Sequence, residues 1–311
     1  MNSIFLQEFR ALGTEIKIFL VLDKKKNVED AKDISQEIKK IYQEKERILS
    51  RFSEKSELSK LNENLDIFEN VSEDILHLAQ KSLEYYKESE RYFDPRILEI
   101  LENVGYKKDF KTNVFSQKEN EKDNIFPKNK LMEDLKIEGK QVCFKRRMDF
   151  SGIAKGYITD LISQYLENSG WQNFLVDSGG DIFAKGKDEQ KERWGIEVEG
   201  IAKEKIILNL ENLAVATSGI TRKKWEVGGE KYHHLINPLH PYNFSFNLKS
   251  VTVMAEICER ADVFAKVLYL MGQKQGMEYA NQKKIPAIFL DYRGNIYVSE
   301  KMKSIIYELR N

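Results

Sequence analysis

The sequence is poor in the residues that build disulfide scaffolds and zinc sites. Among its 311 residues there are two cysteines and four histidines. Cys143 and Cys258 lie far apart in the chain, and neither belongs to a paired motif. Disulfide frameworks and zinc sites need closely spaced sets of such residues, so the sequence disfavours both classes. We expect two buried free thiols.

The chain also lacks an excess of charge of either sign. Fifty lysines and arginines balance fifty aspartates and glutamates, so the formal net charge is zero. A protein without a net field has no long-range attraction for nucleic acid or for an anionic membrane. We therefore expect no nucleic-acid partner, and any anion must be bound by a local group of residues.

Long hydrophobic runs are missing as well. No segment has the roughly 20 apolar residues that cross a bilayer, and Glu8, Arg10, Glu15 and Lys17 interrupt the N-terminal hydrophobic stretch. That stretch alternates like a strand and lacks the basic and then apolar order of a signal peptide. The sequence as given predicts a cytoplasmic protein without a membrane span. If a leader was removed, attachment to a membrane or an extracytoplasmic location is a second possibility.

The hydrophobic pattern that is present predicts several long helices. Apolar residues recur at helical spacing over 29–52 and again after Ser72, a residue suited to a helix N-cap. A third helical stripe over 158–166 stops at Ser169-Gly170, a typical C-terminal signal. Residues 259–272 favour a further helix.

Short strands follow from residue 173 onward. They are connected by hairpin signals such as Gly228-Gly229, and 287–299 predicts a closing hairpin. The sequence therefore predicts an α/β fold with mixed, largely antiparallel sheets. We expect one domain over 1–311, with a charge-dense, aperiodic surface excursion at about 107–130.

The segment "MDFSGIAKGYITD" sets two glycines around a lysine where a helix begins. Gly152 and Gly156 would let the main chain approach a ligand, and the helix N-terminus favours a negative group such as phosphate. Lys155 is unfavourable for the helix itself, by up to about 1 kcal/mol, so an anion would compensate it. A tight turn with a solvated lysine explains the same residues. Two further glycine clusters, "VDSGGDIFAKG" and "AVATSG", together favour a nucleotide pocket.

Two of the four histidines are adjacent in "KYHHLINP", near the end of a predicted strand. Alternation along a strand points His233 and His234 to opposite sides, so at most one of them reaches a site beside the sheet. A structural histidine is the simpler interpretation of either one.

Eight motifs occur in an order that resembles one known family. They are "ALGTEIKI", "LSRFSEKSELSKLN", "FDPRIL", "MDFSGIAKGY", "VDSGGDI", "AVATSG", "HHLINP" and "SVTVMA…ADVFAKVLYLMG". Over nearly the whole chain they resemble the FAD:protein FMN transferases, the ApbE family. The resemblance implies an ApbE-like flavin transferase fold that binds FAD in a cleft. With Mg²⁺, it would move FMN onto a threonine of an acceptor flavoprotein and release AMP. Some similar proteins hydrolyse FAD to FMN and AMP instead.

The resemblance also implies roles for particular residues. His234 and Asp262 would be catalytic, and Asp262 would bind the metal together with the Gly152 carbonyl. Lys266 occupies the position of a further family ligand. FAD contacts would come from Leu12, Phe52, Val104, Gly105, Tyr106, Asp149, Lys155, Asp181, Ser218 and Ile236.

The chain departs from the family at Lys266, where the family has a threonine four residues after the aspartate. A protonated lysine cannot ligate a metal, and three interpretations stay open. Lys266 swings away and leaves Mg²⁺ on Asp262, or its ammonium replaces the metal, or the two residues form a surface pair with no site. The second interpretation predicts a catalytically impaired FAD-binding protein.

A second departure lies in "HHLINPLHPYNF". Asn237 stands where the family commonly has an aspartate, and "LHPY" replaces a Thr-Gly turn. An amide cannot act as a general base or fix a cationic histidine as a carboxylate does. Both departures weaken catalysis more than binding, so the sequence predicts FAD capture more firmly than turnover.

Overall fold

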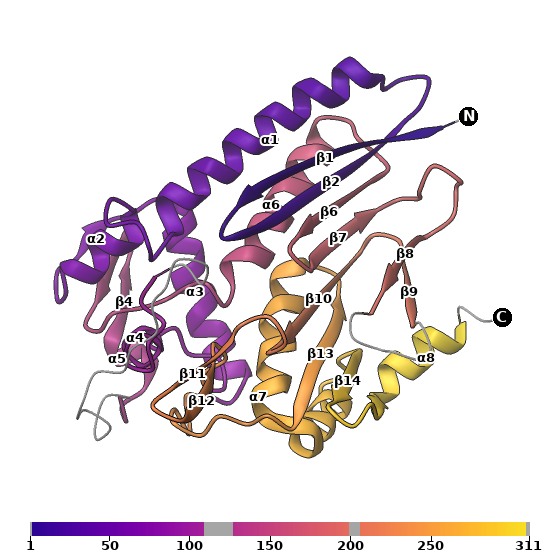
Figure 1. Ribbon diagram of the computed structural model, residues 1–311. Coiled ribbons are helices and arrows are strands. Elements are labelled where there is room, and N and C mark those ends of the chain that lie inside the picture. The colour runs from indigo at the N-terminus through magenta and orange to yellow at the C-terminus, as the bar shows by residue number, and fades with distance from the viewer. Residues whose placement is uncertain (1, 109–126, 199–205, 309–311) are drawn as a thin grey trace. The chain divides into compact units, whose positions relative to one another are not determined.

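The computed structural model describes residues 2–108, 127–198 and 206–308 (Figure 1). Residues 109–126, which make up most of the predicted surface excursion, lie outside this part. The chain forms two compact units. Unit 1 comprises 1–44, 155–218 and 247–311, and unit 2 comprises 45–154 and 219–246. The single domain over 1–311 stays a prediction.

Unit 1 is built on an eight-stranded sheet. Antiparallel pairing joins β1 to β2, β2 to β6, β6 to β7, β7 to β10, β13 to β14 and β14 to β15, while β10 lies beside β13. The predicted largely antiparallel α/β fold is thus confirmed. The strands in sheet order are β1 (Ser3–Ala11), β2 (Thr14–Leu22), β6 (Phe174–Ser178), β7 (Asp181–Lys185), β10 (Leu213–Gly219), β13 (Leu248–Ala255), β14 (Ala287–Asp291) and β15 (Ile296–Val298).

Helices cover one face of this sheet. They are α1 (Val28–Leu49), which continues into unit 2, α6 (Ala154–Asn168) and α7 (Cys258–Gln282). The Ser178 hydroxyl of β6 forms hydrogen bonds with Tyr42 of α1 at 2.7 Å and with Thr159 of α6 at 2.6 Å. Because side chains alternate along a strand, Ile16 and Ile18 point to one face of β2, and both are fully buried.

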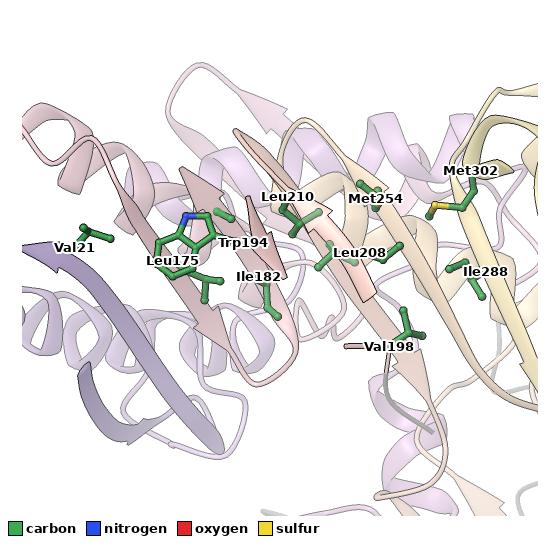
Figure 2. Close-up of a cluster of buried hydrophobic side chains, with 12 residues drawn as sticks. Val21, Leu175, Ile182, Trp194, Val198, Leu208, Leu210, Met254, Ile288 and Met302 are labelled. Carbon is green, nitrogen blue, oxygen red and sulfur yellow. The ribbon is translucent and has the colours of Figure 1, made fainter. Parts of the chain in front are cut away.

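A second hydrophobic layer covers the opposite face (Figure 2). The hairpin of β8 (Trp194–Glu197) and β9 (Ile207–Leu210), together with α8 (Glu300–Glu308), packs on that face. The cluster runs from Val21 of β2 to Met302 of α8. With both faces covered, the central strands are buried on both sides, which is why "NFLV" reads as an apolar run rather than an alternation.

Unit 2 contains short helices and two small antiparallel sheets. The Ser72 hydroxyl accepts a hydrogen bond from the Ile75 N–H at 3.3 Å, so the predicted N-cap is confirmed. A buried Arg96 pairs with Asp94 at 2.8 Å and with Asp134 at 2.6 Å, and thereby holds two segments of the unit together. The elements are α2 (Glu57–Glu63), β3 (Glu69–Asn70), α3 (Glu73–Glu88), α4 (Leu98–Asn103), α5 (Leu131–Asp134), β4 (Leu135–Glu138), β5 (Gln141–Phe144), β11 (Lys224–Val227) and β12 (Glu230–His233).

Two boundaries differ from the sequence-based prediction. The N-terminal strand is in fact a hairpin, because Leu12 and Gly13 both adopt positive φ, 53° and 71°, as a tight turn requires. The helix expected over 259–272 does not end there. Gly272 breaks it with φ 77° and ψ 175°, but helical structure resumes and reaches Gln282. In the described part of the chain no helix could cross a membrane, and Cys143 and Cys258 are buried free thiols, as expected.

The first turns of α6 and α7 lock together in unit 1. A Cβ added at Gly156 would lie 2.6 Å from both the Cys258 carbonyl oxygen and the Glu259 Cα. One turn further along α6, the Asp160 carboxylate accepts the N–H groups of Cys258 at 2.7 Å and of Glu259 at 2.8 Å. Asp160 therefore caps α7, and Gly156 provides the space for that close approach.

We predict that Gly156→Ala destabilises the protein by about 1–3 kcal/mol, because the new methyl group meets backbone that cannot rotate away. The predicted value is a net loss, which already includes the gain of about 1 kcal/mol in helix propensity from glycine to alanine. Chemical denaturation measures the difference. Gln164→Ala, on the exposed side of the same helix, is the control and should change stability by less than about 0.5 kcal/mol. A Gly156→Ala protein as stable as wild type would contradict this packing.

Candidate functional site

Four charged residues of unit 1 form a cluster, called here the charged cluster: Lys155, Asp181, Asp262 and Lys266. Lys155 lies in the first turn of α6, and its ammonium donates to Asp181, the first residue of β7. Lys266 lies one turn after Asp262 on α7, with 3.0 Å between its ammonium and Oδ1 of Asp262. The other Asp262 oxygen accepts the Gly156 N–H at 3.3 Å. The lock between α6 and α7 thus brings two predicted site residues, Lys155 and Asp262, into one group.

The aspartate side chains of the charged cluster are more deeply buried than its lysine side chains. The side chains of Asp181 and Asp262 are 2% and 4% exposed, whereas those of Lys155 and Lys266 are 28% and 18% exposed. Two negative charges are thus compensated by two positive charges, and the positive side is the more accessible one. Such an arrangement suits an anionic ligand better than a free cation.

The pKa values in the charged cluster follow from burial and from these pairings. Burial, with the nearby Asp262 charge, raises the pKa of Asp181 to about 6. Burial also acts to raise the pKa of Asp262, but Lys266 and Lys155 outweigh it and hold that pKa below its usual range. For Lys155, burial acts to lower the pKa, and the two carboxylates overcome it, so the pKa is raised. Lys155 is therefore cationic throughout the physiological range.

Ser218 adds a hydroxyl to the same face of the sheet. In the register of β10 with β7, Ala216 lies opposite Asp181, and Ser218 is two residues further along the same face of β10. Its side chain is largely buried. The structure thus places four residues predicted from different motifs on one side of the sheet: Lys155, Asp181, Ser218 and Asp262.

The charged cluster does not fit a magnesium ion as it is arranged. Among the described residues, no group of three or more His, Cys, Asp or Glu side chains could hold a metal. Both Asp262 oxygens are already engaged, by Lys266 and by the Gly156 N–H. A divalent ion about 4 Å from the Lys266 ammonium would be repelled by roughly 8 kcal/mol at an effective dielectric constant of 20. Asp262 and Lys266 form the pair that the third interpretation expected, but its carboxylate is buried and its lysine half-buried rather than at the surface.

In unit 2, Arg51 connects two predicted site residues, Phe52 and Asp149. Its side chain is only 4% exposed, and its Nε lies 3.2 Å from an Asp149 carboxylate oxygen. The guanidinium carbon lies 4.1 Å from the centre of the Phe52 ring and 4.6 Å from that of Tyr106. Asp149 also accepts the N–H and hydroxyl of Ser151, at 2.7 and 2.9 Å. Asp149 therefore orders the segment that leads into α6.

Sequence reasoning missed Arg51. Its signal was its place directly before Phe52 in "LSRF", but its pairing with a residue almost a hundred positions later follows only from the tertiary fold. Gly152 lies in the turn just before α6 and is buried. The role predicted for its carbonyl stays a prediction.

An aromatic cluster of unit 2 holds the predicted residues 104–106. Tyr106 stacks at a tilt on Phe52 and on Trp225, with ring centres 5.9 and 5.6 Å apart. The Trp225 indole N–H donates to the Val104 carbonyl at 2.7 Å, and Gly105 turns the chain with φ 98°. The side chains of Val104, Tyr106 and Ile236 are buried in this cluster. Phe52 is 41% exposed, so Phe52 is the ring that a ligand can reach.

The two adjacent histidines have different surroundings. His233 is buried, its Nε2 lies 3.0 Å from the Ser245 carbonyl oxygen, and Phe244 and Phe246 meet its ring edge-on. Burial lowers its pKa to about 4, so it is a neutral core residue. His234 is half-buried, with Nδ1 at 3.3 Å from the Lys223 carbonyl oxygen. That contact fixes the proton on Nδ1 and makes Nε2 the basic nitrogen of the ring.

Asn237 has a structural role. Its side-chain oxygen accepts the Leu239 N–H at 3.0 Å, and its carbonyl accepts the His240 N–H at 3.1 Å. The amide thereby shapes the "PLHPY" turn. Leu12 lies in the turn between β1 and β2 of unit 1, and its predicted flavin contact stays a prediction.

Comparison with known proteins finds one matching family and relatives along most of the chain. A family model described as the ApbE family matches residues 12–289. The chain is similar to the FAD:protein FMN transferase of Vibrio cholerae, with 27% identity over 271 residues, 85% of this chain and 80% of that protein. It is also similar to the FAD:protein FMN transferase of Chlamydia muridarum, with 25% identity over 294 residues, 91% of this chain and 90% of that protein.

The fold is similar to a solved structure as well. The apo form of the flavinyl transferase ApbE from Pseudomonas stutzeri superimposes with a TM-score of 0.87, over 98% of this chain and 97% of that one, at 21% identity. At this identity the likeness shows the fold, and it confirms the predicted ApbE-like fold.

We predict that Arg51→Met destabilises unit 2 by about 3 kcal/mol, because it leaves the buried Asp149 charge without its cation. Adding Asp149→Asn should recover part of the loss. The control is Arg147→Met, since Arg147 pairs with Glu102 at 2.7 Å while 37% of its side chain is exposed, and it should cost less than about 1 kcal/mol. Denaturation curves compare the variants, and equal losses for the two arginines would contradict the special position of Arg51.

We also predict an acid-dependent loss of stability from His233. Its pKa is about 4 in the folded protein and about 6.5 when unfolded. The unfolded chain therefore binds more protons between these values, and stability falls as pH drops from 6.5 toward 4. Between pH 7 and pH 5, wild type should lose about 2 kcal/mol more than His233→Leu. The exposed His240→Leu is the control, and identical pH profiles for wild type and His233→Leu would refute the prediction.

Proposed function

The chain belongs to the ApbE family, and on that premise we propose that it transfers the FMN part of FAD to an acceptor flavoprotein. The observation that carries the proposal is the match of one family model to residues 12–289, together with relatives named FAD:protein FMN transferase along most of the chain. We further propose that the acceptor residue is a threonine and that AMP is released.

The charged cluster supports binding of the FAD diphosphate. A diphosphate linking two nucleosides carries two negative charges, and the lysine side chains of the cluster are more accessible than its two aspartate side chains. Lys155 donates from the first turn of a helix, where the helix dipole also favours an anion. Ser218, on the same face as Asp181, would add a hydroxyl donor.

The aromatic cluster supports binding of the flavin ring. Phe52 offers an exposed ring, and Arg51 and Tyr106 hold it from behind. A ring already held in place loses little entropy when a planar ligand stacks on it. We propose that the isoalloxazine stacks on Phe52, and that Val104, Gly105, Tyr106 and Ile236 position this ring as its support.

The proposed transfer is a displacement at phosphorus. The threonine hydroxyl oxygen forms a bond to the phosphorus of the FMN half, and the bond from that phosphorus to the bridging oxygen breaks. AMP leaves with the bridging oxygen and its electron pair. His234, with Nε2 as its basic nitrogen, would accept the threonine proton. Lys155 would stabilise the charge that develops on the departing phosphate.

The family resemblance also implies Mg²⁺, with Asp262 and the Gly152 carbonyl as ligands. The Lys266 ammonium donates to the Asp262 carboxylate instead. In the proposed reaction, Lys155 and Lys266 therefore compensate the negative charge of the diphosphate. In this proposal Asp149 has a positioning role. Its contacts with Arg51 and Ser151 order the segment that leads into α6.

The function is tested by incubating the protein with FAD and a threonine-bearing acceptor protein, with and without Mg²⁺. The expected result is an acceptor heavier by one FMN group, fluorescent after denaturation, with one AMP released for each acceptor modified. AMP produced at the same rate without acceptor would identify a hydrolase. The absence of both the modified acceptor and AMP would contradict the proposed function.

Phe52→Ala should weaken FAD binding about 5- to 150-fold, which corresponds to the roughly 1–3 kcal/mol of stacking one planar base on an aromatic ring. Flavin fluorescence quenching measures the affinity. Phe68→Ala is the control, because Phe68 is another exposed phenylalanine of unit 2, and it should leave the affinity unchanged. Equal effects of the two substitutions would contradict the role of Phe52.

A further inference from the structure

Lys266 is held against Asp262 more firmly than an exposed lysine would be. Its ammonium lies 3.0 Å from Oδ1 of Asp262 and 3.5 Å from the Asp262 carbonyl oxygen. The spacing of four residues on α7 puts both side chains on one face of the helix. Only 18% of the Lys266 side chain and 4% of the Asp262 side chain are exposed. Asp262 is buried and Lys266 is half-buried, so separation of the partners would leave an uncompensated charge on the Asp262 carboxylate.

Lys266 is the ammonium group that contacts Asp262 directly, while Lys155 acts on it from the neighbouring pair. Lys155 donates directly to Asp181, and the Gly156 N–H supplies a neutral donor to the second Asp262 oxygen. With both lysines charged, the four side chains of the charged cluster sum to zero. Without a bound anion, an added divalent ion would place two uncompensated positive charges in this group.

We infer that the Lys266 ammonium is a built-in cation that excludes divalent ions from Asp262, so that this protein binds FAD without a metal. The part of this inference that concerns FAD rests on the proposed function. The part that concerns cation exclusion depends only on Asp262 and Lys266.

Removal of the ammonium should open a cation site. In Lys266→Thr, the buried Asp262 carboxylate loses its nearest positive charge, and a hydroxyl oxygen takes a position one turn away on the same helix face. Carboxylate and hydroxyl oxygens are suitable ligands for a hard divalent ion. Lys266→Met keeps the length and apolar stem of the side chain without its charge, and it serves as a second variant in case the threonine variant folds poorly.

The test measures Mn²⁺ binding directly by electron paramagnetic resonance, with no flavin present. Wild type and Asp262→Asn should bind Mn²⁺ equally weakly, because Asp262 holds no ion in wild type. Lys266→Thr should bind one Mn²⁺ per chain at least on the order of 100-fold more tightly than wild type, and adding Asp262→Asn should abolish this site. The matched control is Lys185→Thr, because Lys185 pairs with Glu167 at 2.9 Å in the same unit and is 27% exposed. It should gain no Mn²⁺.

A second arm measures FAD affinity with EDTA and with Mg²⁺. Wild type should have the same affinity in both, whereas Lys266→Thr should bind FAD more tightly with Mg²⁺. Asp262-dependent Mn²⁺ binding by wild type, or no Mn²⁺ gain in either folded Lys266 variant, would overturn the inference. If no variant binds FAD, the proposed function fails, while the Mn²⁺ result still decides the exclusion of cations.

Discussion

The close approach of α6 and α7 in unit 1 is the constraint on which the charged cluster depends. The α7 backbone lies where a side chain at position 156 would be, so only glycine fits there. Asp160 accepts hydrogen bonds from two N–H groups at the start of α7 that would otherwise lack a partner within the helix. This lock fixes Asp262 beside Lys155 and the Gly156 N–H. Two helices whose sequences are about a hundred residues apart thereby share one buried group of charges. Gly156, which the sequence suggested as part of a phosphate-binding motif, thus has a packing role that does not depend on a ligand.

Unit 2 uses an arginine for a comparable purpose. Arg51 pairs with Asp149 and supports the rings of Phe52 and Tyr106, so one buried cation orders both an exposed aromatic ring and the segment that leads into α6. The rings of Tyr106, Trp225 and Tyr232 pack on one another and support the Phe52 ring. Rigid supports matter for a ligand site because ordering the side chains on binding would cost free energy.

Local signals in the sequence predicted much of the fold. The Ser72 cap, the Gly228-Gly229 hairpin and the helix that ends before Gly170 depend on neighbours within a few residues, and the structure contains each of them. The Arg51–Asp149 pair and the Asp160 cap on α7 join distant segments, so no local pattern could predict them. The Asp262–Lys266 pair follows from local helical spacing, but its burial depends on the packing of α7 in the fold. The family resemblance implied FAD contacts for Val104 and Tyr106, and those contacts stay predictions; the packing of both side chains in the aromatic cluster is a feature of the tertiary fold that no local pattern predicts.

A protein of this family that carries its own cation at Asp262 would bind the FAD diphosphate through lysines. Crystals grown with FAD and Mn²⁺ test this most directly, because the anomalous signal of manganese shows where the ion binds. We predict FAD with its diphosphate against Lys155 and Lys266 and no manganese peak at Asp262. A manganese ion coordinated by the Asp262 carboxylate, with Lys266 turned away, would contradict it.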